Sequence, residues 1–269
     1  MMYDYGLICR KVEDLSRRTG AMIREEVSKV ISSDIRVKGL HDYVTYVDKN
    51  AEEQIVRELQ ALIPEAGFIV EENTINKQGE TFTWVVDPLD GTTNFIHGIP
   101  LYSVSIALMH KEEVVMGVVY EPNRDECFSA VAGKGAFLNG QPIHVSQAVN
   151  LRESLIATGF PYHDYSRMPA FLEMFQWCMK NTHGLRRLGS AAIDLAYLAC
   201  GRFEAFYEYG LNAWDVAAGS LIVKEAGGKV SDFSGRGNYL FGREIVAANA
   251  GVFDPFQEKV NALFGREIN

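Results

Sequence analysis

The segment WVVDPLDGTTNF, residues 84–95, places two carboxylates directly behind an apolar run. Successive apolar residues are typical of a buried strand, and Asp87 ends this one, with Asp90 three positions later. Taken alone, Asp-Pro and Asp-Gly are turn signals, so one interpretation is a tight surface turn. The other interpretation is a functional site, because Asp87 lies where buried backbone meets a loop. A second acidic pair in the chain favours the site.

This second pair is Glu71-Glu72, which follows the short apolar run at 68–70. If the two strands are neighbours, three or four carboxylates converge at their ends and raise one another's pKa. Cations placed among the carboxylates remove that cost, and dense carboxylate oxygens are the ligands that Mg²⁺ selects. The sequence therefore favours a divalent-metal site over a capped turn.

Gly91-Thr92-Thr93, immediately after the aspartates, indicates a site for phosphate. Glycine allows close approach of the backbone, and the threonines can cap a short helix whose first amides bind phosphate. The formal net charge of −9 means that an anionic substrate needs local positive charge, which metal ions supply. A phosphoryl group held there can be attacked by a metal-activated water, with a second metal stabilising the leaving oxygen.

Length, composition and charge limit the class of protein. The 269 residues, 47% hydrophobic and 23% charged, suit an ordinary globular protein with one large domain or two closely packed halves. The negative charge argues against binding to nucleic acid or to an anionic membrane. The first residues do not read as a signal peptide and no apolar run is long enough to span a bilayer, so we expect a cytoplasmic protein.

Periodicity predicts helices first, then a strand-rich centre, then alternating elements. Helices are expected at 4–31, 48–63 (capped by Asp48), 167–181, 190–200, 214–226 and 253–264. Strands are expected at 68–70, through Val86, at 103–109, 114–120 and 126–132 as an antiparallel meander, in a hairpin flanked by 133–135 and 139–140, and at 203–209, 228–233 and 244–248. An internal boundary is expected at 145–165. The pattern favours layered α and β elements in two sub-domains over a uniform βαβ barrel.

Two long motifs carry a family resemblance. WVVDPLDGTTN, residues 84–94, resembles the signature of the inositol monophosphatase family, which are Mg²⁺-dependent, lithium-sensitive phosphatases. WDVAAG at 214–219, continuing to EAGG at 225–228, resembles the second signature of that family. Lys38-Gly39, the segment 42–45 with Asp48, and Glu71-Glu72 resemble further family elements. The resemblance extends from about residue 4 to 264.

The resemblance implies a layered α/β fold, the five-layer αβαβα sandwich of the sugar-phosphatase type, assembled as a homodimer. An N-terminal α+β half, residues 1–150, would carry most metal ligands. A C-terminal α/β half, residues 151–269, would carry Asp215 and the substrate-side residues, the two halves forming one integrated domain. Two to three Mg²⁺ ions are implied for each active site.

The resemblance also implies a role for individual residues. The first metal would be held by Glu71, Asp87 and the backbone carbonyl of Leu89, the second by Asp87, Asp90 and Asp215, and a third, weaker one by Glu71 through water. Thr92, hydrogen-bonded toward Asp48, would orient the attacking water, with Glu71 and Thr92 polarising it. Residues implied to contact the substrate are Asp90, Gly91, Thr92, Gly189, Ser190, Ala191, Glu208 and Asp215.

The implied activity is hydrolysis of inositol monophosphate to inositol and phosphate. Glu208 would accept hydrogen bonds from the polyol hydroxyls, unless it is only a solvated charge at the end of a strand. Arg186-Arg187 could serve an anion or a dimer contact, and a solvated or interface role is the expectation. The same chemistry could instead act on fructose 1,6-bisphosphate, 3′-phosphoadenosine 5′-phosphate or NADP. A different class, a regulatory binding protein that contacts a partner such as transcription machinery, is also open.

Overall fold

The computed structural model describes residues 3–29, 36–39, 42–161 and 164–265, with side chains described in 3–29 and from residue 45 onward within those ranges. Its helices are α1 (Tyr5–Glu26), α2 (Tyr46–Leu62), α3 (Thr92–Ile96), α4 (Met168–Asn181), α5 (Ala191–Ala199), α6 (Ala213–Glu225) and α7 (Phe253–Phe264), with a 3₁₀ helix at Leu151–Glu153. Its strands are β1 (Arg36–Gly39), β2 (Asp42–Val44), β3 (Gly67–Val70), β4 (Phe82–Asp90), β5 (Ser103–His110), β6 (Glu113–Glu121), β7 (Glu126–Val131), β8 (Ala136–Leu138), β9 (Gln141–Ile143), β10 (Leu155–Thr158), β11 (Gly184–Arg186), β12 (Ala205–Tyr209), β13 (Lys229–Ser231) and β14 (Glu244–Ala248). Within these ranges, none of the helices combines the length and apolar character needed to cross a bilayer.

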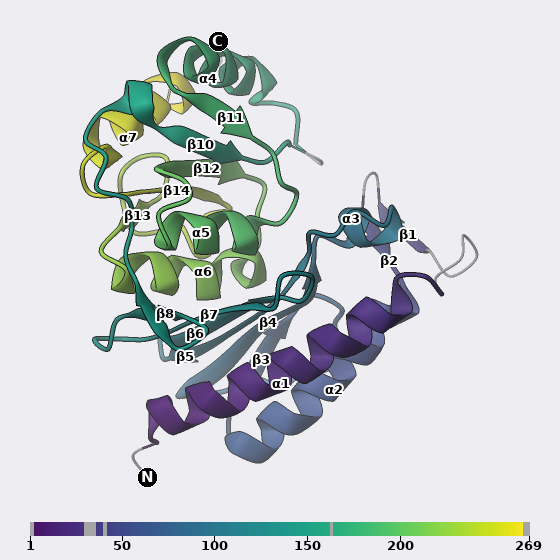
Figure 1. Ribbon diagram of the computed structural model, residues 1–269. Helices are drawn as coiled ribbons and strands as arrows, with labels where there is room; N and C mark the ends of the chain where they lie inside the picture. Colours follow the sequence, from purple (N-terminus) through teal and green to yellow (C-terminus); the bar gives the residue numbers. More distant parts are fainter. Residues whose placement is uncertain (1–2, 30–35, 40–41, 162–163, 266–269) are drawn as a thin grey trace.

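The helices and two large sheets stack in five layers (Figure 1). Helices α1 and α2 cover one face of a seven-stranded sheet of order β3-β4-β5-β6-β7-β8-β9. Helices α5 and α6 lie between this sheet and a five-stranded sheet of order β11-β10-β12-β14-β13, and α4 and α7 cover the far face of the second sheet. The predicted αβαβα sandwich is therefore confirmed.

The seven-stranded sheet contains the predicted antiparallel meander. Strands β4 through β9 pair antiparallel in sequence order, and β3 joins β4 in parallel at the edge. The strand that was expected to stop near Val86 continues through Asp90. The carboxylates of the motif are thus part of the strand itself.

Strand β4 is buried on both faces, which explains its unbroken apolar run. Trp84 and Val86 belong to the core beneath α1 and α2, whereas Val85 belongs to the core around α5 and α6. Strands covered on both faces carry apolar residues in succession because alternate side chains enter different cores. By the same alternation, Asp87 lies on the Val85 face, toward α5 and α6.

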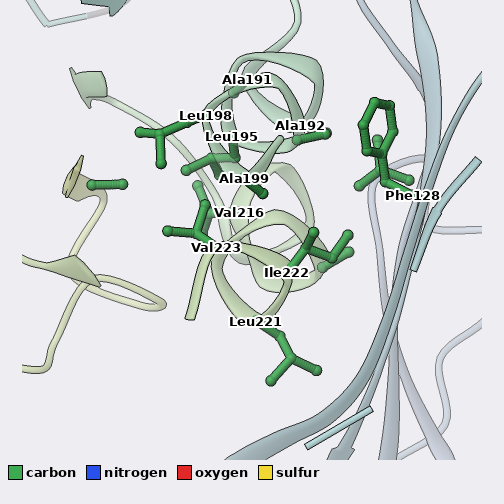
Figure 2. Close-up of a cluster of buried hydrophobic side chains, with 14 of the residues drawn as sticks. Phe128, Ala191, Ala192, Leu195, Leu198, Ala199, Val216, Leu221, Ile222 and Val223 are labelled. Carbon is green, nitrogen blue, oxygen red and sulfur yellow. The ribbon is translucent and has the colours of Figure 1, made fainter. Parts of the chain in front are cut away.

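The middle layer is built from small side chains. Figure 2 shows the alanine and aliphatic side chains of α5 and α6, with Ala192 and Ile222 on the side that faces the sheet residue Phe128. Close packing is also required at Gly117 of β6, where an added Cβ would lie 2.8 Å from the backbone oxygen of Ala218 in α6. The Ala- and Gly-rich sequence of α6 therefore lets the helix lie directly on the sheet that carries Asp87.

The structure differs from the predicted elements at several boundaries. Helix α1 ends at Glu26, earlier than expected. Helix α2 begins at Tyr46 with Thr45 as its N-cap, so Asp48 is not the N-cap residue but caps the helix as the third residue of a capping box. Strands β10 and β11 were not predicted, because strands of three and four residues carry too few positions to show a period.

We expect Gly117→Ala to destabilise the fold by about 1–3 kcal/mol, because the new methyl group overpacks the contact between β6 and α6. The free energy of unfolding from urea titration measures this effect. Gly237→Ala is the matched control, because Gly237 is exposed and an added Cβ there would meet no atom within 4 Å. Equal stability of the two variants would contradict the close packing.

Candidate metal centre

A bulge in β4 turns both aspartates of the motif toward the same layer. Asp87 pairs with Ser105 of β5 and Asp90 pairs with Ser103, so three steps along β4 match two along β5. In a regular strand, residues three apart point to opposite faces. The extra residue in the bulge restores Asp90 to the face of Asp87. Pro88, which has no backbone N–H to donate to a ladder, lies inside the bulge.

The third aspartate comes from the first turn of α6. Asp215 is the third residue of that helix, and its Oδ2 accepts a 2.6 Å hydrogen bond from the backbone N–H of the N-cap residue Asn212. The Ser105 hydroxyl of β5 donates to the backbone carbonyl of Trp214 at 3.2 Å. The start of α6 is thereby attached to the strand position that pairs with Asp87.

Carboxylate oxygens of Asp87, Asp90 and Asp215 all lie within 4.8 Å of one another. Asp87 is 2% exposed, and burial, followed by the charges of Glu71, Asp90 and Asp215, raises its pKa well above the ordinary value. Burial raises the pKa of Asp90 to about 6. Burial and the charge of Asp90 raise the pKa of Asp215 to about 7. The ionised cluster therefore works against the stability of the fold.

Glu71 adds a fourth carboxylate to this group, because its charge and a hydrogen bond with Asp87 contribute to the raised pKa of Asp87. It directly follows β3, whose last residue, Val70, pairs in parallel with Val86. The two acidic pairs are thus at the same edge of the sheet. Neighbouring strand ends bring the carboxylates together, as the sequence indicated.

These residues fit a divalent cation. Carboxylates with raised pKa values and adjacent oxygens are the hard, negatively charged ligand set that Mg²⁺ takes, and a cation among them offsets their repulsion. Leu89 lies between Asp87 and Asp90 in the bulge, and its carbonyl accepts a 3.0 Å hydrogen bond from Thr92 Oγ1. The carbonyl is therefore oriented toward the start of α3, beside the acidic cluster.

Thr92 and Asp48 form a hydrogen-bonded pair next to the cluster. Thr92 Oγ1 lies 3.0 Å from Asp48 Oδ1, to which it can donate. Asp48 Oδ2 accepts from the backbone N–H of Thr45 at 2.8 Å and from its hydroxyl at 2.6 Å. Asp48 is fully buried, and burial raises its pKa. Its position as third residue of α2 makes it a member of a capping box, which brings its second oxygen to Thr92.

Ser190, one of the predicted substrate residues, contacts Asp90. The Ser190 hydroxyl donates to Asp90 Oδ2 at 2.6 Å, and the backbone N–H of Ala192 donates to the same oxygen at 2.7 Å. Ala191 is the first residue of α5 and is buried. Asp90 therefore accepts hydrogen bonds from the N-terminus of α5. These hydrogen bonds lower its pKa, which is why it rises to about 6 while that of Asp215 rises to about 7.

Gly91 and Gly189 lie against each other beside this contact. Gly91 adopts φ of +102°, and an added Cβ there would lie 3.2 Å from the backbone oxygen of Gly189. Asn94 of α3 joins the two segments, because its Nδ2 donates to the carbonyls of Leu101 and Leu188, each at 2.8 Å. Gly91, Thr92, Gly189 and Ser190 are thus brought to one place.

Glu208 is buried in β12 rather than solvated, so the reading as a solvated strand-end charge was wrong. Burial, with the charges of Asp215 and Asp90, raises its pKa to about 8, while Arg187 acts in the opposite direction. The Arg187 guanidinium also opposes the rise in pKa of Asp90 and of the buried Asp194. Arg187 therefore lies near enough to lower the pKa values of these carboxylates, whereas a solvated or interface role was the expectation.

Several site residues escaped the sequence analysis. Asp194 of α5 is 1% exposed, and burial followed by the charge of Glu208 raises its pKa well above the ordinary value. Its apolar helical surroundings gave no signal of a site. Ser105 acts through one hydrogen bond to the backbone of Trp214, and Asn94 acts through two, to the backbones of Leu101 and Leu188. Of the predicted elements, the side chains of Lys38 and of residues 42–44 lie outside the described part of the chain.

The fold and the acidic cluster define a class: layered α/β proteins with a carboxylate cluster that could hold a metal ion, at the ends of sheet strands and at helix N-termini. Within that class, the model of the inositol monophosphatase family matches residues 9–266. The chain belongs to this family, a family of phosphatases.

Relatives and a solved structure agree with this membership. The chain is 43% identical over 243 residues to Nus factor SuhB of Pseudomonas aeruginosa, covering 88% of this chain and 90% of the relative. It is 42% identical over 233 residues to inositol-1-monophosphatase of Mesorhizobium japonicum, covering 86% and 88%. The crystal structure of extragenic suppressor protein suhB from Bartonella henselae superimposes with a TM-score of 0.90 at 38% identity, covering 94% of this chain and 98% of that one.

We expect the metal-free protein to lose stability as pH rises. The folded-state pKa values of Asp90, Asp215 and Glu208 are raised to about 6, 7 and 8, so between about pH 4 and pH 8 the folded state binds more protons than the unfolded state. Stability is then highest below the ordinary carboxyl pKa and falls through this window.

The melting temperature in chelator, measured from pH 5 to pH 8.5, checks this expectation. Millimolar Mg²⁺ should restore much of the loss at pH 8, and Asp87→Asn should flatten the decline. A melting temperature that rises across the window would contradict the repulsion among these carboxylates.

Proposed function

We propose that the protein is a Mg²⁺-dependent phosphomonoesterase that hydrolyses inositol monophosphate to inositol and phosphate. The observation that carries the proposal is the convergence of Asp87, Asp90 and Asp215 within 4.8 Å, beside the Thr92–Asp48 hydrogen bond. Metal-binding carboxylates next to a residue that can orient water are what metal-assisted hydrolysis requires.

The proposed metal ligands follow from this arrangement. Glu71, Asp87 and the carbonyl of Leu89 would hold one Mg²⁺, Asp87, Asp90 and Asp215 a second, and Glu71 through water a third. Bound Mg²⁺ would supply Lewis-acid activation of water and offset the charge of the phosphoryl group and the leaving oxygen. The repulsion among the buried carboxylates supports this ligand set, because it gives the site a reason to take up cations.

The Thr92 hydroxyl would orient the attacking water. It has one proton and two acceptors at 3.0 Å, Asp48 Oδ1 and the Leu89 carbonyl, so it donates to one of them at a time. When Thr92 donates to Asp48, the Leu89 carbonyl is free of this hydrogen bond and the Thr92 oxygen can accept a hydrogen bond from the attacking water. Thr45 holds the other oxygen of Asp48, which fixes the direction of the pair.

The backbone amides of Gly91 and Thr92 would hold the phosphate, and the substrate would extend from there toward Gly189, Ser190, Ala191 and Glu208. The close approach of Gly91 to Gly189 supports a shared surface for these groups. The relative from Mesorhizobium japonicum carries the name inositol-1-monophosphatase, which supports a phosphorylated polyol as substrate. A homodimeric assembly and sensitivity to lithium belong to the same proposal.

Phosphate release across a substrate panel, with and without Mg²⁺, tests this function. The panel contains inositol monophosphate, fructose 1,6-bisphosphate, 3′-phosphoadenosine 5′-phosphate and NADP. The expected result is Mg²⁺-dependent hydrolysis with the highest kcat/KM for inositol monophosphate. Preference for another substrate would assign the same chemistry to one of the alternatives.

We expect Asp87→Asn to abolish turnover because this carboxylate would serve both metals. In metal-free buffer the same change should leave the fold intact and raise the melting temperature, because repulsion within the cluster falls. Asp14→Asn, an exposed position on α1, is the matched control and should keep wild-type activity. Activity near wild type for Asp87→Asn at saturating Mg²⁺ would refute the two-metal site.

We expect Glu208→Gln to lower kcat/KM for inositol monophosphate roughly ten- to a hundredfold, the value of a charged hydrogen bond of about 1.5–3 kcal/mol. Cations at the site would offset the charges of Asp215 and Asp90 that raise its pKa, and so would favour the carboxylate. Hydrolysis of a simple aryl phosphate, which lacks the polyol hydroxyls, should change little. Equal losses on both substrates would mean that Glu208 maintains the structure of the site and does not contact the polyol hydroxyls.

A second candidate function is that of a regulatory binding protein. The relative from Pseudomonas aeruginosa is named a Nus factor, which favours a contact with a partner such as transcription machinery. Copurification of Asp87→Asn with that machinery, at the wild-type level, would separate such a role from catalysis.

A further inference from the structure

Glu52 is a buried carboxylate of α2 that the proposed chemistry does not use. Its side chain is 0% exposed. A carboxylate in such a position is costly unless hydrogen-bond donors satisfy it. The donors that contact Glu52 therefore indicate what it is for.

The donors to Glu52 come from the segment that follows β3. Glu52 Oε2 accepts a 2.7 Å hydrogen bond from the backbone N–H of Glu72. Its Oε1 accepts from the backbone N–H of Thr74 at 2.9 Å and from the Thr74 hydroxyl at 2.8 Å. Both carboxylate oxygens are thus occupied by three donors that lie within three residues of chain.

Glu71 lies between the sheet and the segment that Glu52 holds by hydrogen bonds to Glu72 and Thr74. On one side, Val70 is held by its pairing with Val86 in β4. On the other side, no regular element lies between β3 and β4, so the backbone of Glu72 and Thr74 depends on side-chain partners such as Glu52. The direction in which Glu71 leaves the backbone is therefore determined from both sides.

Helix α2 contacts two segments of the site, the start of α3 and the chain after β3. Asp48 and Glu52 are four residues apart and so lie one above the other on the same face of the helix. Asp48 contacts Thr92, the first residue of α3 after β4, and Glu52 contacts the segment after β3. One helix thereby sets the position of the start of α3 relative to the segment after β3.

We propose that Glu52 is a positioning residue that places Glu71 for metal binding through the backbone of Glu72 and Thr74. The proposal rests on the proposed function, in which Glu71 is a metal ligand. Partners that orient a ligand without touching the metal commonly change metal affinity or activity by about 10- to 100-fold when they are replaced.

Isothermal titration of the purified full chain with Mg²⁺, at a temperature where each variant is folded, tests the role of Glu52. Glutamine offers one acceptor oxygen where glutamate offers two, so Glu52→Gln must lose the contact with Glu72 or those with Thr74. We expect Mg²⁺ to bind Glu52→Gln about tenfold or more weakly. Phosphate release should need correspondingly more Mg²⁺ but should approach the wild-type kcat at saturation.

Two further variants separate position from charge. Glu53→Gln removes the same charge from the next residue of α2, which is exposed, and should bind Mg²⁺ as wild type does. Thr74→Val removes one hydroxyl donor to Glu52 without changing any charge and should weaken Mg²⁺ binding by a smaller factor. Because both changes act through one contact, the double variant Glu52→Gln/Thr74→Val should lose less affinity than the product of the two single losses.

The outcomes distinguish the positioning role from the proposed function. If wild type binds Mg²⁺, Asp87→Asn loses it, and folded Glu52→Gln binds as tightly as Glu53→Gln, the positioning role is overturned and the metal site stands. If wild type itself binds no Mg²⁺, both fail. If Glu52→Gln does not fold, Thr74→Val decides, and unchanged affinity in that variant overturns the proposal.

Discussion

Repulsion among one buried and three partly buried carboxylates is the constraint on which the arrangement of this protein depends. Asp87 is nearly inaccessible to solvent and lies beside Glu71, Asp90 and Asp215, and each of these charges raises its pKa. An apolar core could not tolerate such a group without a cation or a set of hydrogen-bond donors. The fold places this group at the ends of the sheet strands, next to helix N-termini and their backbone amides.

Two helices meet the constraint in the same way. Asp48 in α2 and Asp215 in α6 are each the third residue of their helix. In each, one carboxylate oxygen accepts a hydrogen bond from the backbone N–H of the N-cap residue of the same helix. A carboxylate in this position is stabilised by the helix and is held in one orientation. Elements that are far apart in the sequence thus deliver carboxylates whose directions are already determined before any metal binds.

Close packing gives these orientations their precision. The approach of α6 to β6 at Gly117 leaves no room for a side chain, and Ser105 ties the start of α6 to β5. Because β5 also pairs with β4, the positions of Asp215 and Asp87 are both set by contacts with β5. Displacement of the sheet or of the helix would therefore change the spacing of the carboxylates, and the middle layer serves the site as much as it serves stability.

The sequence by itself determined the layered α/β architecture, the meander and the identity of the acidic residues. Buried strands, amphipathic helices and turn residues leave local patterns, and two signature motifs place Asp87, Asp90 and Asp215 without coordinates. Local patterns could not show that a bulge at Pro88 turns Asp90 to the face of Asp87, because bulge formation depends on the register with β5. They also could not show that Glu208 and Asp194 are buried, that Arg187 acts on the site, or that Glu52 holds the segment after β3. Only the tertiary structure decided these points, because each depends on a contact between residues that are distant in the chain and carry no periodic signal.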